Sequence, residues 1–158
     1  MSFLKDFTKI RCVTYKDDYS INKSSYNDLN ISIEKEVVGC NSSVLGSKQT
    51  KQGDIVIITA NKKSKRYFVI GIIQERLEKC DEWSVRGGNE WKFNFKIKII
   101  TPINEINKEF KNSLKKNCEL ENLNENHLFH SRFCGIRYKN VLINLIKEKI
   151  IICNSEIN

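Results

Sequence analysis

The stretch EKCDEWSVRGGNEW, residues 78–91, carries two tryptophans in a setting with neither helical nor strand periodicity. Trp83 and Trp91 stand on either side of Arg86 and a Gly-Gly turn. An indole in such a polar loop either packs over the rim of the core and hydrogen-bonds through its N–H, or offers a flat surface on which a base stacks. A methylated, electron-poor base would add cation–π attraction. The two tryptophans are candidates for a base pocket, and Arg86 could reach a phosphate.

Basic side chains form a second set, in a chain of 158 residues with 27 Lys and Arg against 19 Asp and Glu and a net charge of +8. Lys and Arg attract anionic partners because they release counterions when they neutralise phosphates. Each could instead keep a sheet edge soluble or form a structural salt bridge. The residues that we expect to contact a nucleic-acid backbone are Lys62, Lys63, Lys65 and Arg66 in one basic run, Lys92, Lys96 and Lys98 on one strand face, and Arg86, Arg132 and Arg137.

Six cysteines and two histidines offer the remaining chemistry. Cys118, His127, His130 and Cys134 are of types that bind zinc, but they lack closely spaced ligand pairs, and we predict no metal. No C-x-x-C occurs, so the cysteines are expected to be free thiols. No motif marks a nucleophile, a phosphate loop or a nuclease centre. We therefore predict a non-enzymatic chain without a cofactor, and a cysteine- or metal-dependent enzyme or a protein-interaction domain remains the alternative.

The first half of the chain is read as one strand, a polar segment and a hairpin. Residues 9–15 are β-branched and aromatic and predict a strand. Residues 16–30 are polar and predict a loop or short helix outside the core, whereas residues 31–38 alternate apolar and charged types. A long loop then ends at Gly53-Asp54. The apolar runs 55–60 and 67–73, joined by basic residues 61–66, predict a hairpin that is buried on both faces.

The second half begins with the clearest period-two pattern, KFNFKIKII over residues 92–100, which predicts a half-exposed strand with Lys92, Lys96 and Lys98 on one face. Pro102 and the apolar spacing that follows it predict a helix over residues 103–116. The remaining expectations are a polar loop over 117–126, irregular chain with a short strand over 127–138, a helix around 141–146, and either more helix or a last strand over 150–152.

These elements predict a single domain over residues 1–158 of the α+β class, with a small mixed β-barrel or sheet flanked by a few helices. No apolar run approaches the length of about 18 residues that crosses a bilayer. The sequence MSFLKDFTKIRC lacks the features of a secretory signal. We therefore expect no membrane association and a cytoplasmic location.

The order of these features resembles the YTH and EVE domains of the PUA-like superfamily, which bind nucleic acid and in some members hold a modified base in an aromatic cage. Five collinear stretches carry the resemblance: KIRCVTYKDDYSI, KQGDIVIITANKKSKRYFVIGIIQE, EWSVRGGNEWKFNFKIKII, PINEI and FHSRFCGIRYKNVLINLIKE. They are similar to the family's first strand and turn, its hairpin, its two-tryptophan loop and alternating strand, its proline-led helix, and its closing segment. Together they cover most of residues 9–148 and imply a PUA-like fold.

The resemblance also implies site residues. Trp83 matches a cage wall of the YTH family, and Trp91 matches the second tryptophan, which helps to shape the pocket. The family's further cage tryptophan follows the second strand, where residues 38–42 read VGCNS and hold no aromatic side chain. Tyr15 or Tyr19 would then substitute, or the pocket accepts a base other than N6-methyladenine. The other expected pocket residues are Asn41, Ser42 and Ser43, which could hydrogen-bond a base edge.

We therefore expect a nucleic-acid-binding domain that holds a flipped, methylated or otherwise modified base in an aromatic pocket. The resemblance implies DNA targeting in a modification-dependent restriction system, with an ATPase or nuclease as a possible partner or fused domain. The composition, rich in Lys, Ile and Asn as in AT-rich genes, favours DNA over RNA. The alternatives are a methylated-RNA reader and a B3-like sequence-specific DNA-binding domain of a restriction enzyme.

Overall fold

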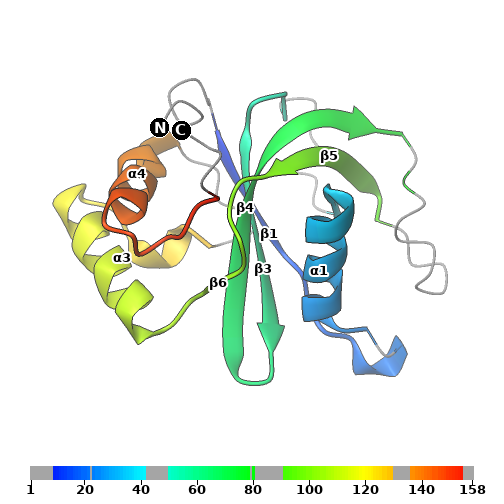
Figure 1. Ribbon diagram of the computed structural model, residues 1–158, viewed down its shortest axis with the longest axis horizontal. Helices are drawn as coiled ribbons and strands as arrows, with labels where there is room; N and C mark the ends of the chain where they lie inside the picture. The colour runs from blue at the N-terminus through cyan, green and yellow to red at the C-terminus, as the bar shows by residue number, and fades with distance from the viewer. Residues whose placement is uncertain are drawn as a thin grey trace.

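The computed structural model describes residues 9–21, 23–41, 50–78, 80, 91–129 and 136–154. A mixed six-stranded sheet lies at its centre (Figure 1). The strands are β1 (Ile10–Thr14), β2 (Val37–Cys40), β3 (Ile55–Lys62), β4 (Lys65–Leu77), β5 (Phe93–Ile99) and β6 (Asn104–Glu105). Their order is β1-β3-β4-β5-β2, with β6 paired to β4. β1 is parallel to β3, and the other pairs are antiparallel.

The predicted α+β class is confirmed, but the sheet is not a closed barrel. β1 and β2 lie at opposite ends of the strand order. Helix α1 (Ser25–Lys35) packs against both β2 and β3, so a helix rather than further strand pairing connects the two halves of the curved sheet.

The helices cover the two faces of the sheet and create two hydrophobic cores. Figure 1 shows α1 on one side and α3 (Lys108–Leu120) with α4 (Lys139–Lys147) on the other. Three 3-10 turns complete the described elements: η2 (Tyr19–Ile21), η4 (Glu125–His127) and η5 (Ile136–Tyr138). The central strand β3 is buried on both faces because alternate side chains enter the two cores.

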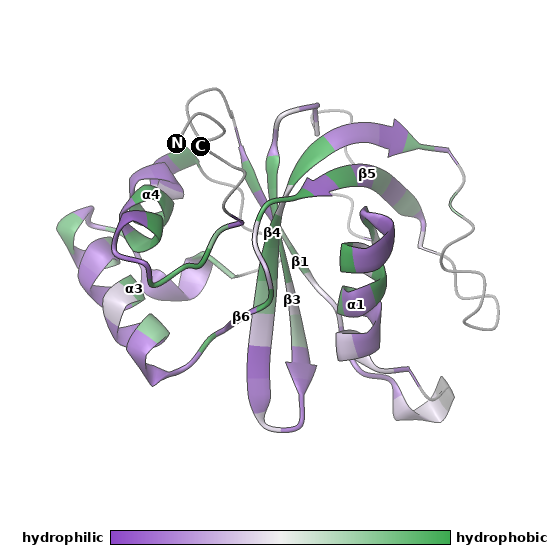
Figure 2. Ribbon diagram, in the orientation of Figure 1, coloured by the Kyte–Doolittle hydropathy of each residue, from purple (hydrophilic) through white to green (hydrophobic). Residues whose placement is uncertain are grey.

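The β3–β4 hairpin and strand β5 follow the predicted patterns. Residues 55–60 are all buried, and the register from Ile55–Ile72 to Lys62–Lys65 extends the strands further into the basic run than expected. The free end of the hairpin is hydrophilic (Figure 2). On β5, Phe95 and Ile97 are buried while Lys96 and Lys98 are exposed, which confirms the half-exposed strand.

Residues 16–38 match the prediction only in part. They form η2, α1 and the short strand β2, and α1 covers one face of the sheet instead of lying outside the core. The buried side chains of α1 are Leu29 and the polar residues Ser25, Asp28 and Ser32. A short helix was one of the two expectations for residues 16–30, but its placement outside the core was wrong. A helix whose buried face is mostly small and polar has little apolar periodicity, so the sequence pattern does not show that it is buried.

The helix predicted over 103–116 is displaced along the sequence. Asn104 and Glu105 form β6 against β4, and α3 begins only after its N-cap, Asn107, whose side chain accepts a hydrogen bond from the Phe110 N–H at 2.8 Å. Helix α3 then continues to Leu120, into the segment predicted as a loop. β4 recruits residues 104 and 105 because its edge offers unpaired backbone groups there.

The C-terminal elements match the prediction in part. Helix α4 confirms the helix expected around 141–146. Residues 150–152 form neither helix nor strand. The Asn104 side chain accepts a hydrogen bond from the Ile152 N–H and donates one to the Ile152 carbonyl. In the described part of 127–138 there is a 3-10 turn and no strand. The described chain has no helix both long and apolar enough to cross a membrane.

Candidate nucleic-acid interface

Trp91 is a half-buried indole held at the end of β2, directly before β5. It lies so close to Gly39 that a Cβ atom there would be 2.2 Å from the indole Cδ1. Its ring stacks on Tyr15, with 5.4 Å between ring centroids and an interplanar angle of 26°. The Lys92 N–H, next in the chain, donates to the Asn41 side-chain oxygen at 2.8 Å. These contacts fix the tryptophan at the margin of the α1-side core.

Tyr15 packs against one face of the Trp91 ring. It is fully buried, and its hydroxyl hydrogen-bonds Ser32 at 2.7 Å and accepts from the Gly39 N–H at 3.3 Å. Burial raises the pKa of Tyr15 well above its ordinary value, so the phenol stays protonated. The structure therefore places Tyr15 behind Trp91, where it orients the indole, and gives it no solvent-facing surface.

A lysine covers the Trp91 ring. The Lys23 Nζ lies 4.3 Å from the indole centroid and 3.9 Å from the Asp28 Oδ2. The Lys23 side chain is 16% exposed and that of Asp28 only 2%. An ammonium group over an indole is stabilised by cation–π attraction, and the buried carboxylate adds a charge partner. Trp91, Lys23 and Asp28 together form what we call the cation site.

Local structure fixes the backbone on both sides of Lys23. Asp18 and Lys23 exchange backbone hydrogen bonds of 2.9 and 2.8 Å, which close the turn that carries η2. Ser24 is the N-cap of α1, and its hydroxyl accepts from the Asn27 N–H at 3.3 Å. Asp28 lies in the first turn of this helix, so α1 positions the carboxylate opposite the lysine.

A hollow of about 260 Å³ adjoins the cation site between the start of α1 and the tip of the β3–β4 hairpin. Lys23 is part of its lining, so one side chain belongs to both features. Tyr19, which is 89% exposed, stands at its rim. The other lining residues are Asp17, Ser24, Asn27, Asn61, Lys62 and Lys63. The hollow thus combines cationic, hydrogen-bonding and aromatic groups.

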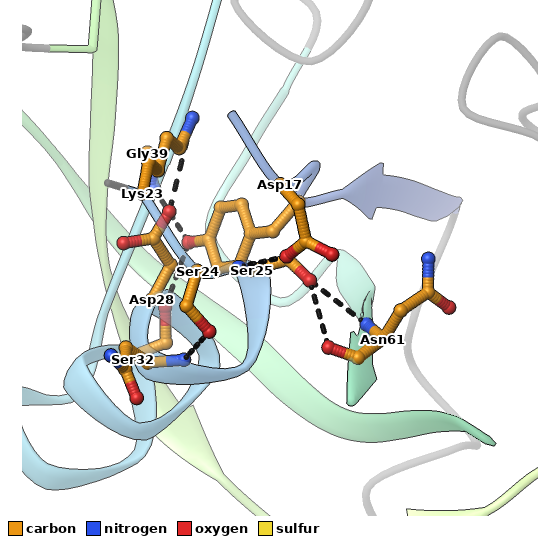
Figure 3. A network of polar contacts seen from close by, with 10 residues as sticks. Asp17, Lys23, Ser24, Ser25, Asp28, Ser32, Gly39 and Asn61 are labelled. Atoms are coloured by element: carbon orange, nitrogen blue, oxygen red, sulfur yellow. Dashed lines mark hydrogen bonds and ion pairs between the residues drawn. The ribbon is translucent and has the colours of Figure 1, made fainter. Parts of the chain in front are cut away.

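Hydrogen bonds tie the hairpin tip to α1 beside this hollow. The Ser25 hydroxyl accepts from the Asn61 N–H at 2.9 Å and lies 3.1 Å from the Asn61 carbonyl, while the Ser25 N–H donates to Asp17 at 2.7 Å (Figure 3). The Lys62 Nζ lies 4.7 Å from the ring centroid of Tyr26, also on α1. Lys62 and Lys63 therefore reach the same region as Lys23.

The predicted basic set is divided between two faces of the sheet. Lys96 and Lys98 alternate with Phe95 and Ile97, which point into the α1-side core, so these lysines project from the opposite face. Lys92 is exposed beside Trp91, with its Nζ 5.8 Å from the Phe93 ring centroid.

Lys65, Arg66 and Arg137 are not part of the lining of the hollow. Lys65 forms an ion pair with Glu105 at 3.5 Å. The Arg66 guanidinium lies 5.7 Å from the Phe129 ring centroid in the other core, where burial lowers its pKa. Arg137 is exposed in η5, in front of α4. Of the residues predicted to contact a nucleic-acid backbone, Lys62 and Lys63 line the hollow. Lys65, Arg66 and Arg137 lie apart from it.

Several predicted site residues lie outside the described residues: Trp83, Ser42, Ser43, Arg86 and Arg132. Asn41 is described and exposed, and its oxygen anchors Lys92 as noted above. His130 and Cys134 of the weighed zinc set also lie outside the described part, whereas Cys118 is fully buried and His127 is exposed. Among the residues that the structure describes, no group of three or more His, Cys, Asp and Glu side chains could hold a metal.

Three residues of the site were not predicted from the sequence: Lys23, Asp28 and Gly39, which leaves space for the indole. A glycine in a strand often marks a close approach of another group, and Gly39 before the expected long loop was such a signal. Ser25, Asp28 and Ser32 recur at helical spacing, which could have indicated a polar buried face. Nothing in the sequence pattern distinguishes Lys23 from the other lysines, because its burial depends on tertiary contacts.

Comparisons of the chain with protein-family models, with curated proteins and with solved structures find no match.

Proposed function

We propose that this chain is a non-catalytic nucleic-acid-binding domain that holds a modified base, flipped out of its strand, against Trp91. The observation that carries the proposal is the position of this indole, which is half-buried, packed against Tyr15 and Gly39, and covered by Lys23. The Lys23 side chain also lines a hollow with two further lysines. Stacking on such a ring contributes roughly 1–3 kcal/mol per base. That amount offsets the few kcal/mol that base flipping costs.

The flanking phosphates would then lie along the hairpin tip. Lys62 and Lys63 are exposed at the hollow, and Asn61 adds polar groups there. Lysines at such positions bind the backbone of any sequence and give the interaction its salt dependence. We retain DNA as the proposed substrate, with a modification-dependent restriction nuclease or ATPase as the proposed partner.

A PUA-like fold of the YTH or EVE type is part of this proposal. Its support is the order of elements, in which a parallel β1–β3 pair is followed by antiparallel β4 and β5 and the two-tryptophan stretch leads directly into β5. Gly39 stands near the place where the YTH family carries a further cage tryptophan, and Trp91 fills the space beside it. The altered cage favours a base other than N6-methyladenine.

The experiment is titration of single- and double-stranded oligonucleotides, with and without modified bases, into the wild-type chain and the variants Trp91→Ala and Trp83→Ala. We expect Trp91→Ala to lose at least about tenfold in affinity for the modified strand, the factor that corresponds to stacking. Equal affinities for modified and unmodified strands in all proteins would overturn the proposal. RNA and DNA of the same sequence decide between the two backbones.

A matched pair of double variants tests which face of the sheet the nucleic-acid backbone follows. Lys62→Gln/Lys63→Gln removes two charges at the hollow, and Lys96→Gln/Lys98→Gln removes two from the opposite sheet face. The first should weaken binding and reduce its salt dependence, while the second should change little. The B3-like alternative is favoured by the same hairpin tip, which protrudes beyond the helices (Figure 1). It predicts that charge reversal at Lys62, Lys63 and Lys65 abolishes sequence-specific binding while Trp83→Ala and Trp91→Ala have little effect.

A further inference from the structure

We propose that the cation site reads a positively charged base, one alkylated on a ring nitrogen, and that Lys23 occupies this site as a stand-in cation until such a base displaces it. The inference rests on the proposed function, because it names the class of base that the same site would take. It depends on three described groups: the Trp91 indole, the Lys23 ammonium and the Asp28 carboxylate.

The side chain that fills the site indicates what chemistry the site stabilises. The Lys23 ammonium is placed over the indole at 4.3 Å and beside a carboxylate that is 98% covered. The faces of aromatic rings carry partial negative charge, and Trp is the strongest cation–π partner among side chains. Both neighbours therefore favour a positive charge at this point.

Replacement of Lys23 by a base also favours a base that carries a positive charge. A neutral base that moved Lys23 aside would take a positive charge away from a buried carboxylate, which is strongly unfavourable. A base that is itself cationic replaces one positive charge by another, and it adds ring stacking that an ammonium group lacks. The site should consequently discriminate between bases by charge.

The displaced side chain has a place to go. Lys23 also lines the 260 Å³ hollow, and its backbone is held by the paired hydrogen bonds with Asp18. Rotation of the side chain alone can therefore move the ammonium from the indole toward the hollow.

Isomeric bases supply the test. 3-Methylcytosine carries a positive charge at neutral pH, and N4-methylcytosine, its isomer, does not; 1-methyladenine and N6-methyladenine form the corresponding purine pair. Each is placed in the same single-stranded DNA and titrated into the wild-type chain. We expect the charged member of at least one pair to bind about tenfold more tightly than its neutral isomer, which matches a cation–π contribution at a partly buried site.

Three variants distinguish a Lys23 that competes with the base for the site from a lysine that only attracts the phosphates. Lys23→Met removes the competing cation but retains the apolar stem, so binding of the charged base should strengthen several-fold. Lys63→Met removes a lysine from the same hollow without freeing the indole, so binding of the same strand should weaken. Asp28→Asn should reduce the ratio between the charged and neutral isomers. If Asp28→Asn fails to fold, the opposite signs expected for Lys23→Met and Lys63→Met still decide the matter.

Failure of this inference differs from failure of the proposed function. The proposal that the site selects a charged base is overturned if both charged bases bind no more tightly than their neutral isomers. It is also overturned if Lys23→Met binds the charged base more weakly than the wild type. If modified strands are still preferred over unmodified ones and Trp91→Ala removes the preference, the proposed function stands. If no modified strand is preferred and Trp91→Ala changes nothing, both are overturned.

Discussion

The position of Trp91 depends on Gly39, because any side chain at residue 39 would occupy the space of the indole. In Gly39→Ala the new Cβ would stand 2.2 Å from the indole Cδ1 and 2.4 Å from the Cγ, so the indole has to move. We expect a stability loss of roughly 1–3 kcal/mol, as for overpacking, together with a shift in tryptophan emission and weaker binding of the modified strand. Fluorescence in a Trp83→Phe background, where Trp91 is the remaining tryptophan, measures the shift.

Gly71→Ala is the control for this prediction. Its Cβ would meet the Ile97 Cδ1 at 3.2 Å and the Lys98 carbonyl at 3.3 Å, on strands β4 and β5 and away from the indole. This variant should lose stability and retain the emission of the parent. An unchanged emission in Gly39→Ala as well would show that the close approach does not determine where the indole lies.

Cys118 links stability to pH. It is fully buried in the α3–α4 core, and burial raises its pKa from 9.0 to about 11. Because the folded pKa is the higher one, the thiol contributes full stability below about pH 9 and loses that contribution as the pH rises toward 11. We expect Cys118→Ala to be less stable at pH 8 but to lose about 1 kcal/mol less than the wild type between pH 9 and pH 10. Urea unfolding at the three pH values tests this, and parallel losses in the two proteins would contradict it.

At the scale of elements, α1 carries the groups that build the cation site. Ser24→Ala removes the hydrogen bond from the Asn27 N–H and should cost about 1 kcal/mol of unfolding free energy. Since Asp28 lies in the first helical turn, fraying of this end should also displace Lys23 and alter Trp91 emission. Denaturant titration and fluorescence of the Trp83→Phe background give both values.

Asn107→Ala provides the comparison, because Asn107 caps α3 through an equivalent hydrogen bond from the Phe110 N–H. It should cost a similar free energy while Trp91 emission stays unchanged, since α3 lies across the sheet. If both variants shift the emission alike, the effect comes from global loosening and not from the link between α1 and the site.

Apolar periodicity determined which elements the sequence could predict. The hairpin strands and β5 bury regular apolar patterns, and all were predicted correctly. The burial of α1 against the sheet was missed because this helix buries Ser25, Asp28 and Ser32 through hydrogen bonds and an ion pair that only the folded chain creates. β6 was missed because it has only two residues, Asn104 and Glu105, which are too few to show an alternation of apolar and polar side chains.

The candidate site was predictable to a similar extent. Trp91 was identified because an indole in a polar loop is unusual, and Lys62 and Lys63 because they lie at a hairpin tip. The separation of Arg66, Lys96 and Lys98 from them follows from the sheet face that each residue occupies, which depends on the strand register. Lys65 shares the register pair with Lys62 but is drawn to Glu105 by an ion pair. Charge counts along the sequence contain no such information.

On the scale of the whole molecule, β3 connects the two cores. Ile55 and Ile57 belong to the core beneath α3 and α4, while Val56 and Ile58 belong to the core beneath α1. Neither core can lose this strand without exposing the other, because successive side chains on it face opposite sides. The described chain should therefore unfold as one cooperative unit, and the position of the cation site should depend on packing across the sheet.

Leu145→Ala tests this coupling from the distant core. Leu145 is fully buried on α4, so its truncation should cost about 2–5 kcal/mol. If the two cores unfold together, the Trp91 emission transition and the far-ultraviolet circular dichroism transition move to the same lower urea concentration. Leu29→Ala, which truncates a fully buried leucine of α1, should produce the same coincidence from the other side. A Trp91 transition that remains at the wild-type midpoint in Leu145→Ala would mean that the α1 side folds independently, and the cation site would then survive loss of the α3–α4 core.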